Sequence, residues 1–210
     1  VRKVWHAIKE YEAVYGSNEH SYWLQFELLW REYFHWSLRV NGPTYFHYNG
    51  ISQAKLTPPE LNKDHWRAWQ QASTGMPMID AGLIELKHTG FVSNRMRQWL
   101  ASYFINDLNL DWRLGARFFE QHLIDFDVAS NWGNWAYLAG MGHDPRAQPG
   151  QGRYFSLNKQ LHQYDPELIH LHHWLPQLRH CSLQHIVDHQ SGRHPLANYR
   201  SPVQLLGAAN

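Results

Sequence analysis

A chain of 210 residues is long enough to bury one substantial hydrophobic core, so a single large domain is expected. Its net charge of +1, with histidines counted as neutral, excludes a molecule-wide positive field for nucleic acid, and a single cysteine, Cys181, excludes an internal disulfide. No apolar run approaches the roughly 20 residues that span a bilayer, so no membrane association is expected, and one cysteine is typical of a reducing, cytoplasmic compartment.

Helical spacing recurs along most of the chain. Residues 21–40 place aromatic side chains three and four positions apart after Ser21, which we expect to be the N-cap. Glycines and prolines interrupt residues 41–65, which are predicted to form a long loop. No strand-like alternation, internal repeat or heptad pattern is present, so the fold class is predicted to be all-α. Further helices are predicted over 65–73, 78–90, 91–108, 111–124 and 166–178.

Tryptophan is strongly enriched, with 11 residues in a chain whose aromatic content is 15%. Indole packs hydrophobic cores, but it also stacks on planar ligands and can lose one electron. Core packing explains most of these residues, and the excess favours a planar cofactor.

Two helical faces combine charged, amide and aromatic residues. Glu27, Trp30 and Arg31 in the segment ELLWREY share one face, where spacing alone favours a surface ion pair beside a packed indole. Asn94 and Arg97 share another face, which either binds a phosphate or carboxylate or is simply solvated.

Two carboxylates open the segment DFDVASNWGNWAYLAG. Asp125 and Asp127 are candidates for a metal pair, an acid–base pair, or acceptors for Arg97 and for the N–H groups of a heterocycle. A metal pair is disfavoured because no further carboxylates lie nearby in the sequence. The histidines of residues 170–173 lack a clear fourth ligand, so no metal site is expected.

A resemblance to a known family rests on four segments that occur in order: ELLWREYF, STGMPMIDAGLIELKHTGFVSNRMRQWLASYFINDLNLDWRLGARFFE, DFDVASNWGNWAYLAGMGHDPR and YDPELIHLHHWLPQL. From about residue 22 to residue 178 the chain resembles the helical, FAD-binding domain of the photolyase and cryptochrome family. Gln98, Asn131, Tyr137 and the string SNWGNW resemble the cryptochrome DASH branch of that family.

The resemblance implies that FAD lies among the helices and is surrounded by polar residues. Asn131 is expected to face flavin N5, and Asp125 is expected to pair with Arg97 beside the ring in a desolvated site. Asp127 is expected to accept a hydrogen bond from the ring system or the ribose. Asn94 is expected to lie near the cofactor.

An electron relay is also implied by the resemblance. Trp135 is expected to lie closest to the flavin, with Trp112 as the next step. The third position of the family's relay falls on Pro59, so either Trp66 substitutes for it or the relay is incomplete.

The implied activity is repair of cyclobutane pyrimidine dimers in DNA. Reduced FAD excited by blue light donates an electron, the cyclobutane ring splits, and the electron returns. Flipping the lesion out of the stack costs least in single strands, so single-stranded DNA is the expected partner. Glu27 is expected to hydrogen-bond or protonate the dimer, Trp30 and Tyr137 to stack on it, and Arg31 to contact phosphate. Glu27 and Arg31 are also expected to touch the cofactor.

Residues 1–178 are predicted to form this helical domain, and residues 179–210 a polar, irregular C-terminal tail. The family's phosphate-binding loop, with the pattern T-S-x-L-S-P, is not found in these 210 residues. Its N-terminal antenna domain, where a second chromophore is expected to bind, is not found either. Two alternatives therefore stay open: a non-catalytic flavin light sensor that signals to a protein partner, and a truncated domain that no longer holds FAD.

Overall fold

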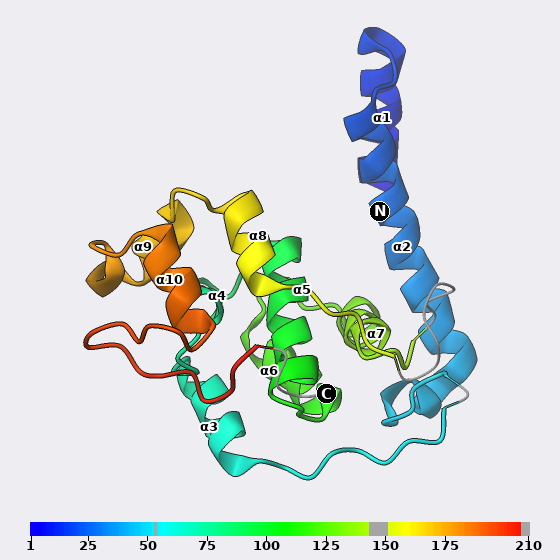
Figure 1. Cartoon of the computed structure of the whole chain (residues 1–210). Helices are drawn as coiled ribbons and strands as arrows, with labels where there is room; N and C mark the ends of the chain where they lie inside the picture. The colour runs from blue at the N-terminus through cyan, green and yellow to red at the C-terminus, as the bar shows by residue number, and fades with distance from the viewer. Residues whose placement is uncertain (53, 143–150, 207–210) are drawn as a thin grey trace.

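The computed structural model describes residues 1–52, 54–142 and 151–206 (Figure 1). No strand occurs in these residues, which confirms the all-α prediction. No helix in this part of the chain is both long enough and apolar enough to cross a bilayer. The α-helices are α1 (Arg2–Tyr15), α2 (Glu19–Asn41), α3 (Lys63–Gln71), α4 (Pro77–Thr89), α5 (Asn94–Ser102), α6 (Trp112–His122), α7 (Val128–Leu138), α8 (Leu157–Tyr164), α9 (Ile169–Trp174) and α10 (Leu183–Gln190). Three short helical turns, η1 (Gly42–Phe46), η2 (Tyr103–Asp107) and η3 (Pro176–Leu178), lie between them.

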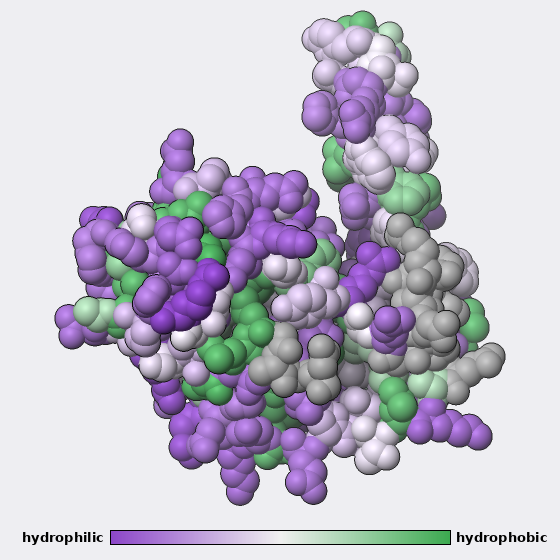
Figure 2. Space-filling model, in the orientation of Figure 1, coloured by the Kyte–Doolittle hydropathy of each residue, from purple (hydrophilic) through white to green (hydrophobic). Residues whose placement is uncertain are grey.

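Helices α1 and α2 form a hairpin that projects from the rest of the molecule (Figure 1). The Asn18 side chain accepts the N–H of Ser21, and the Ser21 hydroxyl accepts the N–H of Asn18, so the N-cap is Asn18. The predicted cap at Ser21 was therefore wrong by three positions. Glu12 of α1 accepts hydrogen bonds from the Ser21 hydroxyl at 2.6 Å and from the Gln25 amide at 2.8 Å, which joins the two helices. Figure 2 shows apolar and hydrophilic patches alternating along this hairpin.

The hydrophobic core is built around α4, α5, α6 and α7. Trp69, Tyr103 and Phe104 are fully buried there. Helices α6 and α7 approach closely because Gly115 has no side chain: a Cβ atom at Gly115 would lie 2.3 Å from the ring of Trp135. This close packing fixes α7 against its neighbours, and α7 carries much of the candidate site.

The part of residues 179–206 that was predicted to be irregular contains a helix, α10, and packs on the body of the protein. His189 of α10 is fully buried. Its Nδ1 accepts the N–H of Leu196 at 3.0 Å, so its Nε2 carries the proton that is donated to the carbonyl of Gly75 at 2.9 Å. The prediction failed here because the contacts that order the segment come from residues more than a hundred positions earlier in the chain.

Candidate functional site

Two adjoining cavities lie where α2, α5 and α7 meet. The inner cavity, of about 110 Å³, is enclosed by α5, the end of α6, the segment leading into α7, and α7 itself. The outer cavity, of about 520 Å³, opens between α2 and the helices α5 and α7. Because they share a wall, a ligand in one cavity lies next to a ligand in the other. The five residues of this wall are Asn94, Gln98, Ser130, Asn134 and Tyr137.

The structure brings together site residues that were predicted from separate segments of the sequence. These residues lie in the walls of the two cavities. The roles assigned to them stay predictions. The inner cavity contains Asn94, Arg97, Asp125, Asp127, Asn131, Trp135 and Tyr137 in its walls, and the outer cavity contains Glu27, Trp30, Arg31, Asn94 and Tyr137. Trp112 lies in neither wall and lines a separate hollow that also contains Pro59.

Arg97 and Asp125 form the expected ion pair at the inner cavity. Arg97 Nη2 donates to both carboxylate oxygens of Asp125, at 3.1 and 2.9 Å, and Arg97 Nε donates to the carbonyl of Val92 at 2.9 Å. The Asp125 side chain is 46% exposed in this structure, and the expected desolvation of the pair beside the flavin stays a prediction. Solvent screens such a pair, so its geometry serves to orient the guanidinium more than to stabilise the fold.

Asn131 presents an acceptor to the inner cavity. The residue is buried on α7, and its Nδ2 donates to the carbonyl of Ala116 on α6 at 3.0 Å. With the amide nitrogen held there, Oδ1 is the polar atom left to meet a ligand. An N–H group at the edge of a heterocycle is the partner that this oxygen can accept from.

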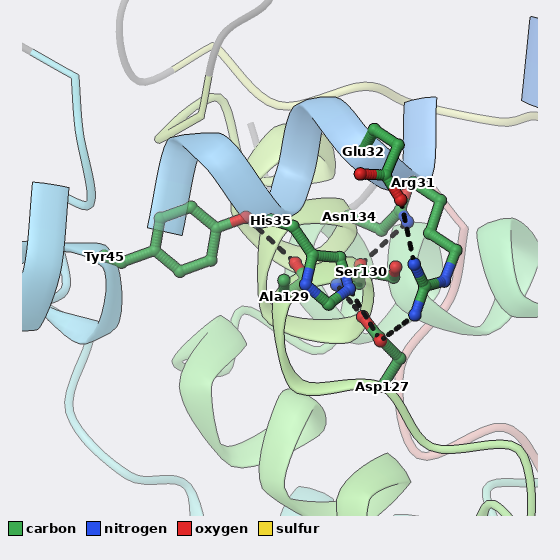
Figure 3. A network of polar contacts seen from close by, with 8 residues as sticks. All are labelled: Arg31, Glu32, His35, Tyr45, Asp127, Ala129, Ser130 and Asn134. Carbon is green, nitrogen blue, oxygen red and sulfur yellow. Dashed lines mark hydrogen bonds and ion pairs between the residues drawn. The ribbon is translucent and has the colours of Figure 1, made fainter. Parts of the chain in front are cut away.

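Asp127 is the centre of a polar network between α2 and α7 (Figure 3). Its Oδ1 accepts the N–H of Ser130, which makes it the N-cap of α7, and its Oδ2 contacts Arg31 at 3.2 Å and His35 at 2.8 Å. Burial acts to raise the pKa of Asp127, but the hydrogen bonds from Ser130 and His35 outweigh it and hold that pKa below its usual value. Both oxygens thus have protein partners, and the predicted contact of Asp127 with the ring or ribose stays a prediction.

His35 was not singled out from the sequence. It lies one helical turn after Arg31 on α2, so the same i,i+4 spacing that grouped Glu27 with Arg31 would have included it. Its partner Asp127 is 92 positions away, and no local pattern predicts that contact.

The outer cavity combines one carboxylate with several aromatic rings. Glu27 is exposed and makes no hydrogen bond to any other residue that the structure describes. Trp30 packs edge-on against Tyr33, with ring centroids 5.4 Å apart, and is partly exposed to the cavity. On the opposite wall, the Arg153 guanidinium lies 4.6 Å from the centre of the Tyr137 ring, a cation–π contact that sequence reasoning missed.

The two predicted relay tryptophans lie on α6 and α7. Trp135 is buried against Phe104 and Phe119, at 5.5 and 5.1 Å between ring centroids, with one edge in the inner cavity. Trp112 is buried, and its Nε1 donates to the carbonyl of Tyr48 at 2.9 Å. Trp66, the candidate third member, contacts Phe104 at 6.1 Å.

The match to a family model decides what this arrangement is. Residues 23–204 match the family described as the FAD binding domain of DNA photolyase. The chain belongs to the photolyase and cryptochrome family. No cluster of three or more His, Cys, Asp or Glu side chains that could hold a metal ion occurs among the described residues of this photolyase-type domain.

Relatives of the domain carry the name cryptochrome DASH, as the sequence predicted. The cryptochrome DASH of Idiomarina loihiensis is 45% identical over 178 residues, which cover 85% of this chain and 38% of that protein. That of Synechocystis is 44% identical over 178 residues, covering 85% and 35%. The photolyase-type domain therefore spans well under half the length of the curated relatives it matches.

Solved structures of the family share the fold. A Synechocystis cryptochrome superposes with a TM-score of 0.80 at 42% identity, covering 88% of this chain and 37% of that one. A photolyase from Sulfolobus tokodaii, whose structure holds two FAD molecules, gives a TM-score of 0.75 at 30% identity, covering 94% and 44%. These likenesses confirm the FAD-binding helical fold.

The residues at the inner cavity fit a flavin. Trp135, Phe119 and Leu138 supply apolar surface for a planar ring, and the Asn131 oxygen and the Arg97 guanidinium supply an acceptor and a donor for its polar edge. FAD is the cofactor for which a domain of this family is built, and the cavity supplies both kinds of contact that its ring system needs.

Proposed function

We propose that this chain is the flavin domain of a blue-light-driven DNA photolyase of the cryptochrome DASH kind, acting on cyclobutane pyrimidine dimers. The observation that carries the proposal is the shared wall between the flavin-fitting inner cavity and the outer cavity, which contains Glu27 and Trp30. A dimer in the outer cavity would lie against the cofactor, as one-electron transfer between them requires. The buried, single Cys181 supports a reducing, cytoplasmic compartment for such a protein.

The inner cavity would orient the cofactor. Bound FAD, reduced and excited by light, would supply one electron to the dimer and recover it after the ring has split. Asn131 would accept a hydrogen bond through Oδ1, and Arg97, held by Asp125, would donate one. Trp135, which is buried and lines the cavity, would keep water from that side of the ring.

The outer cavity would receive the flipped lesion. Trp30 and Tyr137, on facing helices, would stack on its two bases, and Glu27 would donate a proton to, or share one with, a dimer carbonyl. Arg31, held by Asp127 at 3.2 Å, would contact the neighbouring phosphate. Because unstacking costs least without a complementary strand, single-stranded DNA is the proposed preferred partner.

The test is repair of a dimer-containing oligonucleotide under blue light by the FAD-loaded chain, in single and double strands. Glu27→Gln should keep FAD and lower the repair rate about 10-fold or more, the effect of losing a charge-assisted hydrogen bond of ~1.5–3 kcal/mol in the transition state. Glu10→Gln, on the exposed face of α1, is the matched control and should repair normally. Bound FAD with no repair in either strand form would contradict the enzyme and favour the light sensor.

A further inference from the structure

Trp132 lies on α7 one turn before Trp135, but it is in the wall of neither cavity. Its ring contacts the Trp112 ring, with centroids 5.8 Å apart and planes at 77°. Trp135 in turn packs against Gly115, one turn after Trp112 on α6. Three indoles thus cluster along the α6–α7 contact, from the flavin-fitting cavity outward.

The indole N–H groups of this cluster have different acceptors. Trp112 Nε1 donates to the backbone carbonyl of Tyr48, which cannot keep a proton. Trp132 Nε1 donates to a carboxylate oxygen of Glu120 at 3.1 Å, and Glu120 is exposed to solvent. Loss of an electron makes the N–H of an indole far more acidic, so a carboxylate that accepts its hydrogen bond can take the proton. A carbonyl in that place can only hold it.

One other indole in the described residues donates to a carboxylate. Trp23 contacts Glu19 at 3.3 Å, but it lies half-exposed on the projecting part of α2, and its ring contacts are with Tyr22 and Phe26. Trp132 is therefore the indole that combines contact with Trp112 and a proton acceptor.

We propose that Trp132 is the outer electron donor of this chain's relay and that Glu120 takes its indole proton. The inference rests on the flavin function proposed above. When Trp135 loses an electron, Trp112 donates one to Trp135. Trp132 then donates one to Trp112. The N–H bond of oxidised Trp132 breaks, the proton bonds to Glu120, and a neutral indolyl radical is left. A small thiolate in solution then supplies the electron, becoming a thiyl radical, while Glu120 returns the proton.

The other candidates for this step are less well placed. Pro59, which lies beside Trp112 in the wall of the separate hollow, has no oxidisable ring. The Trp66 ring packs against the rings of Phe104 and Phe118, with centroids 6.1 and 6.3 Å apart. Phe104, which also packs against Trp135, therefore stands between the two indoles, and a phenyl ring resists oxidation.

The first experiment is flash spectroscopy of the chain loaded with oxidised FAD. Trp132→Phe should abolish the long-lived neutral tryptophan radical, and Glu120→Gln, which keeps a hydrogen-bond acceptor but cannot take the proton, should leave a cation radical that recombines at least several-fold faster. Trp99→Phe is the control, because Trp99 is similarly buried but donates to the amide of Gln160. A long-lived neutral radical that survives in Trp132→Phe would overturn the proposal.

The second experiment needs no flavin and separates this inference from the proposed function. The apo chain is oxidised with a soluble ruthenium polypyridyl photo-oxidant, and oxygen added at each tryptophan is measured by peptide mass spectrometry. Trp132 and Trp99 are almost equally exposed, at 8% and 6%, so exposure alone predicts equal oxidation. We expect Trp132 to be oxidised several-fold more, and Glu120→Gln to bring it down to the level of Trp99. Equal oxidation in the wild-type chain would overturn the inference whether or not FAD binds.

Discussion

Gly115 stands at the closest approach of α6 and α7. A Cβ atom there would lie 2.3 to 3.0 Å from three ring atoms of Trp135, an indole that is buried and cannot swing away. We expect Gly115→Ala to lower the free energy of unfolding by about 1–3 kcal/mol, as overpacking does, and to move the Trp135 ring into the inner cavity. Urea denaturation and tryptophan emission measure the two effects. Gly16→Ala, which meets no atom within 4 Å, is a control that carries only backbone strain from its φ of +81°.

Asp127 makes the stability of the site depend on pH. Its carboxyl pKa is held below the ordinary value of 3.8, so the unfolded chain binds the proton more tightly than the folded one. Its stabilising contribution is complete above that ordinary value and is lost as the pH falls through the lowered pKa.

The prediction follows from that sign. Asp127→Asn keeps a capping oxygen but loses the charge that faces Arg31 and His35, so it should be less stable than wild type by about 1 kcal/mol at pH 5. The difference should shrink at pH 3. Urea denaturation at the two pH values checks this, with the exposed Asp64→Asn as control. A difference that stays constant between the two pH values would contradict the charge interpretation.

At the scale of elements, the C-terminal segment is tied to the start of α4 by a buried carboxylate. Asp80, 2% exposed, accepts hydrogen bonds from the Thr74 N–H and hydroxyl, from the Gly75 N–H and, at 2.8 Å, from the hydroxyl of Tyr199. Four donors satisfy a group that would otherwise be costly to bury. Tyr199, in the segment after α10, thus supplies one of the hydrogen bonds that Asp80 of α4 needs.

Removing the Tyr199 hydroxyl should destabilise the folded protein. Tyr199→Phe leaves one oxygen of a buried carboxylate short of a donor, so we expect the free energy of unfolding to fall by about 1–3 kcal/mol. The loss should be seen by thermal and by urea denaturation. Tyr15→Phe, on the exposed end of α1, removes a hydroxyl that lies in solvent and should change nothing. Equal stabilities of the two variants would show that Tyr199 does not anchor the segment.

Local spacing was enough to group residues on the faces of α2 and α5, whereas the family resemblance was needed to assign these faces and the residues of α7 to one site. The spacing grouped Glu27 with Arg31, and Asn94 with Arg97, because residues three and four apart share a helical face. It did not predict α10, whose ordering contacts are with residues near Gly75. These contacts depend on how segments distant in the sequence pack together, which a local sequence pattern cannot predict.

For the whole molecule, the inner cavity lies within the body, between α5, α6 and α7, and the outer cavity lies between α2 of the projecting hairpin and the helices α5 and α7. A ligand that fills both cavities would contact α2, α5 and α7 together. Figure 3 shows α2 fastened to the start of α7 by Asp127, Arg31 and His35, and Tyr45, just after α2, donates to the carbonyl of Ala129 at 2.9 Å. A ligand bound where α2 meets α7 would therefore stabilise the packing of these two helices as well as the cavity that holds it.

That placement predicts how FAD should affect stability. At 100 times its dissociation constant a ligand of the folded state adds about 2.7 kcal/mol, which for a chain of this length raises Tm by roughly 5–10 °C. We expect this rise with FAD and a smaller one for Arg97→Gln, which cannot form the bidentate pair with Asp125. Lys63→Gln, at the start of α3 away from both cavities, should bind FAD as wild type does. Differential scanning fluorimetry over a range of FAD concentrations measures the shift. Linkage requires any ligand that binds only the folded state to raise Tm. An unchanged Tm at every concentration would therefore mean that the 210 residues of this chain do not hold the cofactor by themselves.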